Sequence, residues 1–266
     1  MRLLRRAEAL EITVLLIITV LILSYPDVHD PFILIVSFLS AFTGVFFHEI
    51  FHKYFALRRG RRGVRIMPSI PGILLGIITA LRSEGTLVLM QPAYVMWEEE
   101  YPFKVVFSKA EEKEEEKQKK LTEYLKQDAE ISLAGPAANG VVSVFLLASL
   151  LIIKLMYGSF YDFLVSALVN ESDLQFLTPL VLYALLSFNS MLSFINLVPI
   201  PLPPIMVTDG AIFLVNAIEL HKRGRLKDAP WTLFLLSLIG AILYILFLLG
   251  TFEEVLQAYD VLLEEA

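Results

Sequence analysis

Long apolar runs, separated by short charged segments, set the pattern of this sequence. Four of the runs are each close to the ~20 residues that a transmembrane helix needs, at about positions 8–25, 32–57, 131–158 and 231–250. A further apolar region begins at Leu174 and extends to the basic segment 221–227. The pattern therefore predicts an all-α polytopic membrane protein with about five to six transmembrane helices.

Residues 66–97 are also apolar, but they are poorly suited to a single spanning helix. Prolines and glycines interrupt the segment, and Arg82 and Glu84 stand in its middle. Its two halves are rich in β-branched residues and flank the sequence RSEG, which is typical of a turn. We expect a small membrane-associated β-hairpin over residues 73–96; the alternative is one poorly formed transmembrane helix.

Polar segments connect the apolar runs. The tract 98–128 carries Glu and Lys at i,i+4 spacing, which is typical of a solvated helix, and we expect it to be a cytosolic linker. Residues 159–175 are expected to form an outer loop, and the acidic C-terminal tail is expected to be external. No internal repeat is evident in the sequence, so a single transmembrane domain over residues 1–266 is predicted.

The apolar region that begins at Leu174 is interrupted before its end. Four prolines stand between residues 199 and 204, and they must break a helix. Irregular backbone at membrane depth is tolerated only where it is buried in protein or lines a cavity. This break therefore predicts a cavity or a buried site near the segment that follows it.

The composition supports a membrane location and restricts the possible chemistry. Hydrophobic residues make up 56% of the chain, and the 19% of charged residues is below the ~25% usual in soluble domains. The net charge of −6 does not indicate a nucleic-acid partner; the expected partners are the lipid bilayer and other membrane proteins. Because cysteine is absent, any metal must be held by histidine and carboxylate side chains.

The distribution of arginine predicts the orientation. Arginines cluster at the N-terminus, at Arg2, Arg5 and Arg6, and again in the segment 58–65. Positive charge beside transmembrane helices favours the cytosolic side. We therefore expect a multi-pass protein of the cell membrane, with a cytosolic N-terminus and with the end of the second span facing the cytosol.

That second span contains the sequence His48-Glu49-Ile50-Phe51-His52. On a helix the two histidines share a face and can bind one Zn²⁺, while Glu49 lies beside that face and can act as a general base. The alternative is a pair of hydrogen-bonded histidines in a helical bundle. Ionisable groups are expensive in lipid and usually functional, which favours the metal site.

A catalytic zinc usually has three protein ligands, so a third is required. His29 lies on the other side of the membrane in the expected topology, and His221 is possible but poorly placed in the basic segment. Asp209 directly follows the proline break, and we expect it to be the third ligand. Asp209 also suits the N-cap of a helix over 210–220, and the two roles are compatible.

Three motifs, in this order, resemble those of the site-2 protease family of intramembrane zinc metalloproteases. They are HEIFH, AGPAAN at 134–139, and NLVPIP…DG across 196–210. The resemblance covers a catalytic core from about residue 32 to 220. It implies one zinc ion held by His48, His52 and Asp209, and Glu49 as the catalytic acid/base.

The resemblance also implies roles for residues around this core. Asn196 would help to hold the substrate or the oxyanion, and Gly135 and Asn139 would pack the third span against the catalytic helix. The segment after the second span would be the family's β-hairpin, which offers an edge strand to an extended substrate.

The sequence departs from the family pattern in three places. The spacing from asparagine to aspartate is longer than usual, Ala211 stands where a second glycine is often found, and Phe51 replaces a common glycine. The expected function is an intramembrane zinc endopeptidase that cleaves transmembrane segments of other proteins. The alternative is a metal-binding membrane protein without peptidase activity, such as a transporter or an inactive scaffold.

Overall fold

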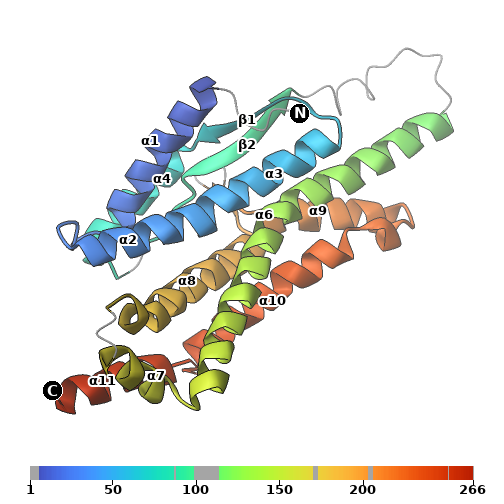
Figure 1. Cartoon of the computed structure of the whole chain (residues 1–266). Coiled ribbons are helices and arrows are strands. Elements are labelled where there is room, and N and C mark those ends of the chain that lie inside the picture. Colours follow the sequence, from blue (N-terminus) through green and yellow to red (C-terminus); the bar gives the residue numbers. More distant parts are fainter. Residues whose placement is uncertain are drawn as a thin grey trace.

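The computed structural model describes residues 6–86, 88–98, 114–169, 173–202, 206–250 and 252–265 (Figure 1). The described part is mainly helical, with two short antiparallel sheets. The helices are α1 (Arg6–Leu23), α2 (Pro31–Ser40), the π-helix η1 (Ala41–Phe46), α3 (Phe47–Arg58), α4 (Ile70–Arg82), α6 (Glu114–Tyr157), α7 (Phe160–Val169), α8 (Asp173–Leu197), α9 (Asp209–Lys222), the 3-10 helix η2 (Leu226–Asp228), α10 (Trp231–Leu248) and α11 (Glu254–Glu265). The strands are β1 (Arg62–Pro68), β2 (Ala93–Glu98), β3 (Pro201–Leu202) and β4 (Met206–Val207).

Within the described residues, four helical segments are long and apolar enough to cross a membrane. They are Pro31–Arg58, Glu115–Tyr157, Gln175–Leu197 and Trp231–Leu248. The expectation of an all-α membrane protein is thus supported by helix length and composition, whereas the expected five to six spans exceed the four found. The expected first span forms as α1, but this helix carries three charged residues, Arg6, Glu8 and Glu11, and is not among the four.

One charged residue of α1 has a partner on α3, the helix that carries the HEIFH sequence. The buried Glu8 carboxylate pairs with the ammonium of Lys53 on α3, and the same oxygen accepts a hydrogen bond from the backbone N–H of Ile66 on β1 at 3.0 Å. A buried charge is tolerated when it is paired and hydrogen-bonded. This ion pair therefore attaches α1 to α3 and β1.

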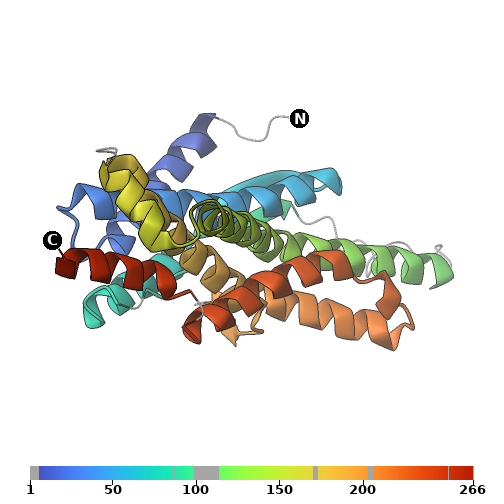
Figure 2. The same cartoon turned by 60° about the horizontal axis from the view of Figure 1, so that its bottom comes forward.

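The helix α6 is the centre of the assembly. It packs against α3, α8, α9 and α10. Figure 1 shows it crossing the molecule obliquely, and Figure 2 shows it between the α2–α3 segment and α10. Its N-terminal part contains residues 114–128 of the polar tract that we expected to be a linker, and the helix continues from there without a break through the expected third span to Tyr157. Residues 99–113 of that tract lie outside the described residues.

The expected β-hairpin over 73–96 is wrong in its first strand, because residues 70–82 form the helix α4. Ser69 caps this helix by accepting a hydrogen bond from the N–H of Gly72, and Pro71 occupies its first turn, where proline is favoured. The strand that pairs with β2 is instead β1, with Ile66 opposite Val95. The sheet forms between more distant segments than the local pattern predicted.

The expected outer loop 159–175 and the expected external tail both contain helices. The helix α7 lies in the loop region, and α11 lies in the tail. These helices pack with α6, α8 and α10 around a core of buried residues comprising Leu150, Phe160, Phe163, Leu164, Leu186, Leu243, Val255, Ala258 and Tyr259. Burial of this apolar surface explains why the expected loop and the expected tail form helices. We call the nine buried residues the α7–α11 cluster.

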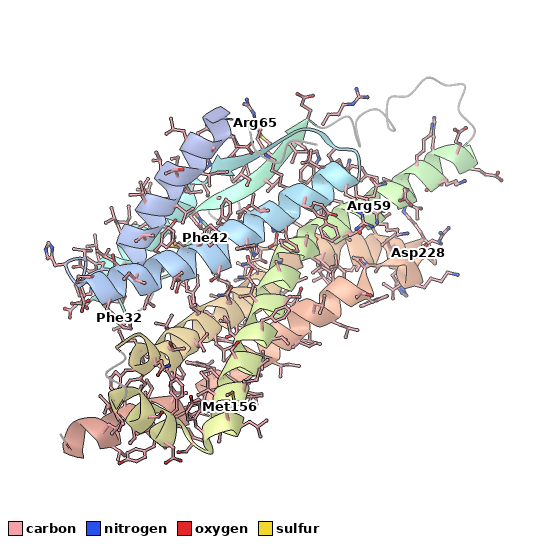
Figure 3. All side chains as sticks on the ribbon, in the orientation of Figure 1. Phe32, Phe42, Arg59, Arg65, Met156 and Asp228 are labelled. Atoms are coloured by element: carbon pink, nitrogen blue, oxygen red, sulfur yellow. The ribbon has the colours of Figure 1, made fainter. Side chains whose placement is uncertain are left out.

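The two ends of the molecule differ in the side chains that they carry. Figure 3 shows Arg59, Arg65 and Asp228 at one end and Phe32 and Met156 at the opposite end. The charged end includes the first turns of α6 and the last turn of α9. The HEIFH motif lies in α3, and its last residue, His52, precedes Arg58 at this charged end by about two helical turns.

Candidate metal centre

The two histidines of the motif face each other on α3. Their spacing of four residues places both imidazoles on one face of the helix. The Nε2 atoms of His48 and His52 are 3.0 Å apart, and both residues are buried. The helix is entered from the π-helix η1, a rare form that is often found at functional sites.

The other nitrogen of each imidazole ring is held by α6. The Nδ1 of His48 is 2.9 Å from Oδ1 of Asn139, and the Nδ1 of His52 is 2.6 Å from the carbonyl oxygen of Ile131. A carbonyl oxygen only accepts hydrogen bonds, so each Nδ1 carries the proton and donates it. When the rings are neutral, both Nε2 atoms therefore present lone pairs to each other.

Asn139 also fixes its own orientation. Its Nδ2 donates a hydrogen bond of 3.1 Å to the carbonyl oxygen of Gly44, which lies in η1. This contact assigns the other amide atom, Oδ1, to His48. The fully buried Asn139 therefore connects α6 both to the π-helix and to the first histidine.

Asp209 completes the group from the first turn of α9. Its Oδ2 atom is 3.2 Å from Nε2 of His48 and 3.3 Å from Nε2 of His52. The helix begins at Asp209 itself and the N-cap position is Thr208, so the capping role considered for Asp209 is not the one found. Thr208 instead holds the preceding loop, because its hydroxyl donates to the carbonyl of Val198 and accepts from the N–H of Ile200.

Three electron-pair donors therefore converge within 3.0–3.3 Å of one another. The lone pairs of these three atoms repel one another unless a cation lies between them. A proton on one ring can bridge only two of the three atoms, whereas one metal ion can bind all three. Two imidazoles and a carboxylate are a known zinc ligand set, and bond lengths of about 2.0–2.1 Å in a tetrahedron separate the ligand atoms by ~3.3 Å. The residues present thus fit a metal ion.

Gly135 of α6 lies directly against these donor atoms. A Cβ atom built on Gly135 would be 2.3 Å from Nε2 of His52 and 2.5 Å from Nε2 of His48. Any side chain at this position would therefore occupy the space beside the converging nitrogens. Gly135 leaves that space open. This role is additional to the packing role that we expected for Gly135.

The carboxylate of Glu49 is buried beside the histidines. Within the described residues its Oε2 atom has no hydrogen-bond partner. An unpaired buried polar atom is unusual and calls for a functional explanation. Glu49 also lines a cavity with His48, His52 and Asp209, so this free oxygen lies in the compartment that contains the metal-binding group.

That cavity has a volume of about 540 Å³. Its lining comes from α3, β2, the start of α4, the middle of α6 and the start of α9, through His48, Glu49, His52, Pro68, Ser69, Ile70, Pro71, Gln91, Tyr94, Val95, Trp97, Asp128, Ile131, Ser132, Val207, Asp209 and Ile212. The β1–β2 sheet thus forms one wall, and α6 and α9 form another.

The other residues considered from the sequence are not part of this group, although the backbone of Asn196 lies against Gly210, the neighbour of Asp209. Asn196 does not line the cavity; its Nδ2 donates to the carbonyl of Leu192 on its own helix at 3.1 Å. His221 is exposed in the last turn of α9, twelve residues or about 18 Å along the helix from Asp209. His29 is exposed in the turn before α2.

Two functional contacts were not predicted, those of the Ile131 carbonyl and of the Gly44 carbonyl. Both are backbone groups, for which a sequence carries no signal. Comparison of the chain with protein-family models, with curated proteins and with solved structures found no match in any of the three. What the protein does must therefore be inferred from the chemistry of this site.

Proposed function

We propose that the protein is a zinc endopeptidase that cleaves transmembrane segments of other membrane proteins, as site-2 proteases do. The observation that carries the proposal is the juxtaposition of a three-donor metal group with the unpartnered Oε2 of Glu49 in one large cavity. The order of the motifs HEIFH, AGPAAN and NLVPIP…DG supports the same family. One zinc ion per chain would be held by His48, His52 and Asp209.

The residues of the chain then have distinct tasks. When bound, Zn²⁺ supplies Lewis-acid polarisation of a carbonyl group. Glu49 accepts a proton at Oε2 from the attacking water and passes it to the amine that leaves. Asn139 and the Ile131 carbonyl hold the two imidazoles with Nε2 unprotonated, so that both can act as ligands.

The cavity has features that suit an extended peptide. A helical substrate hides its carbonyls in hydrogen bonds, so it must unwind before it can be cut. In the described residues β2 pairs only with β1, and Tyr94, Val95 and Trp97 of β2 line the cavity. A substrate strand can pair with an open strand edge and recover backbone hydrogen bonds there.

The proposed location is the cell membrane, with the N-terminus and the metal centre toward the cytosol. Four apolar helical segments support a membrane location. The orientation rests on the arginines that follow α3 in the segment 58–65, because basic residues favour the cytosolic side.

The decisive experiment measures cleavage and metal content in the same samples. The purified protein is reconstituted in vesicles with a mixture of single-span membrane proteins, and the products are identified by mass spectrometry. Glu49→Gln is expected to abolish cleavage and to retain one zinc per chain, whereas Asp209→Ala is expected to lose both.

Four outcomes would contradict this proposal. Full activity of Glu49→Gln would remove the proposed proton acceptor, and unchanged metal content in Asp209→Ala would place the third ligand elsewhere. Iron in place of zinc would point to different chemistry, since two histidines and a carboxylate also suit Fe(II). A zinc-loaded wild type that cleaves nothing would support the alternative of a metal-binding membrane protein without peptidase activity.

A further inference from the structure

A glutamine side chain reaches from one wall of the cavity to the other. Gln91 lies two residues before β2 begins, and its Nε2 donates a hydrogen bond of 3.4 Å to the carbonyl oxygen of Val207 in β4. Both residues line the cavity. Val207 precedes Asp209 by two residues, which span at most about 7 Å. The amide of Gln91 therefore lies at the end of the β1–β2 wall that is near the metal-binding group.

The two walls belong to different packing units. Among the described residues β2 packs against β1 and α3, whereas α9 packs against α6 and α8. A link between the sheet and α6 lies near the other end of β2, where the Arg61 guanidinium lies over the rings of Trp97 and Tyr124. Gln91 thus provides a contact between the walls on the side of the metal-binding group.

The backbone around Gln91 is firmly held. The N–H of Ser69 donates to the carbonyl of Pro92 at 2.8 Å. On the other side of Gln91, the N–H of Leu89 donates to the hydroxyl of Thr79 on α4 at 3.0 Å. The position of the Gln91 side chain in the cavity is therefore fixed by the fold.

The side-chain amide of Gln91 is held only weakly. Its bond of 3.4 Å to Val207 is longer than the usual 2.7–3.2 Å, so little free energy is lost when the bond opens. The second N–H of Nε2 and the Oε1 acceptor have no further partner among the described residues. Of the described residues that line the cavity, Gln91 alone carries a side-chain amide.

We infer that Gln91 is a substrate-binding residue, whose amide leaves the Val207 carbonyl and donates to a backbone carbonyl of an extended substrate. This inference rests on the proposed function. Alternate residues of an extended segment share a face, and Val95 and Trp97 line the same cavity as Gln91. A substrate strand that pairs with β2 reaches Gln91 at the end near the metal-binding group. Gln91 there takes the substrate-holding role that was expected of Asn196.

Binding of short peptides tests the inference without requiring cleavage. The chain contains two tryptophans, so Trp231→Phe leaves Trp97, which lines the cavity, as a fluorescent reporter. The zinc-loaded parent protein also carries Glu49→Gln, so that the peptides remain intact. The probes are a capped apolar peptide and a set of analogues in which one backbone amide at a time is replaced by an ester, whose carbonyl is a weaker hydrogen-bond acceptor.

Gln91→Leu should weaken binding of the all-amide peptide by about three- to tenfold, as loss of one hydrogen bond commonly does. For one ester analogue the same substitution should cost less than about twofold, because that carbonyl no longer depends on Gln91. Gln91→Leu should retain one zinc per chain. Gln127→Leu is the matched control, because the Gln127 amide pairs with Glu123 on α6 and does not line the cavity. It should leave the binding of every peptide unchanged.

Equal binding of the all-amide peptide to the parent and to Gln91→Leu would overturn the inference. A loss of the same size for every ester analogue, or a loss of zinc, would indicate a purely structural role and would overturn it as well. Absence of peptide binding by the parent would also overturn it. Failure of the proposed function is measured separately, by cleavage in protein that retains Glu49. Coupled binding in a protein that cleaves nothing would remove the peptidase and keep the role of Gln91 in peptide binding.

Discussion

Two regions of the molecule are packed on the same central helix by different means. Around residues 131–139 of α6, the contacts with the metal-binding group are two hydrogen bonds, from His48 to Asn139 and from His52 to the carbonyl of Ile131. Gly135 adds a close approach of the α6 backbone to the same histidines. Further along α6, the α7–α11 cluster consists of large apolar side chains such as Leu150, Phe163 and Leu164. The first region depends on the positions of individual atoms, whereas the second depends mainly on buried volume.

This difference determines which amino-acid substitutions each region tolerates. Apolar contacts are non-directional and roughly additive in area, so substitutions in the α7–α11 cluster should change the stability of the fold. Contacts around the metal-binding group orient ligand atoms, so substitutions there should change metal affinity more than stability.

Gly135→Ala should have the largest effect. The added Cβ would lie 2.3 Å from Nε2 of His52, so zinc affinity should fall by more than about a hundredfold while the helix content is retained. Zinc titration and circular dichroism measure the two quantities. Gly140→Ala is the matched control, because its Cβ would instead meet the carbonyl of Leu236 on α10 at 2.1 Å. Gly140→Ala should lower the melting temperature and leave one zinc per folded chain. If Gly140→Ala lost zinc and Gly135→Ala retained it, the proposed difference between the two regions would be wrong.

Leu164→Ala should destabilise the α7–α11 cluster by about 2–5 kcal/mol, the usual range for removing a buried leucine side chain. Leu164 is fully buried, whereas Leu155 on α6 is 85% exposed and serves as the control. Leu155→Ala should change stability by less than ~0.5 kcal/mol. Thermal unfolding in detergent measures both, and a large loss of zinc affinity in Leu164→Ala would contradict the separation of the regions.

Asn139→Leu should lower zinc affinity by about 10–100-fold, as loss of a hydrogen-bond partner of a metal ligand commonly does. Asn139→Asp keeps an oxygen acceptor for Nδ1 of His48 and should recover most of the affinity. Asn189 is an equally buried asparagine, but its Nδ2 donates to Thr43 and to the carbonyl of Leu185. Asn189→Leu should therefore leave the affinity nearly unchanged, and equal losses in both leucine variants would indicate a purely structural role.

Tyr259→Phe should have the smallest effect. The hydroxyl of Tyr259 on α11 donates to the carbonyl of Phe176, and loss of that bond should reduce stability by about 1 kcal/mol. Burial raises the pKa of Tyr259 from 10.0 to about 12, so the neutral hydroxyl is favoured in the folded protein. Its contribution should be fully present below pH 10 and be lost as the pH rises through about 12.

The difference in melting temperature between wild type and Tyr259→Phe should therefore shrink over this pH range. A difference in melting temperature that is constant from pH 8 to about 12 would contradict a stabilising role of the neutral Tyr259 hydroxyl. Zinc affinity should be the same in both proteins at neutral pH, since Tyr259 belongs to the apolar cluster.

Sequence reasoning was successful where the pattern is local. Apolar runs of sufficient length predicted the helices that could cross a membrane, and i,i+4 spacing predicted that His48 and His52 share a face. It failed where a local helix-start signal was overlooked and where tertiary contacts decide. Residues 70–82 are apolar and β-branched yet form α4, because Ser69 and Pro71 start a helix there. The loop and tail regions form α7 and α11 because they can bury apolar surface against α6, α8 and α10.

The sequence alone determined which residues can act as metal ligands, since it lacks cysteine and contains four histidines. It also determined the spacing of the histidine pair along the helix. Only the tertiary structure decided that Asp209 reaches both Nε2 atoms, that Asn196 and His221 do not line the cavity, and that Gln91 does. A helical period specifies a face over a few residues, whereas the contacts of His52 with α6 and α9 join residues 79 to 157 positions apart and depend on how α3, α6 and α9 pack.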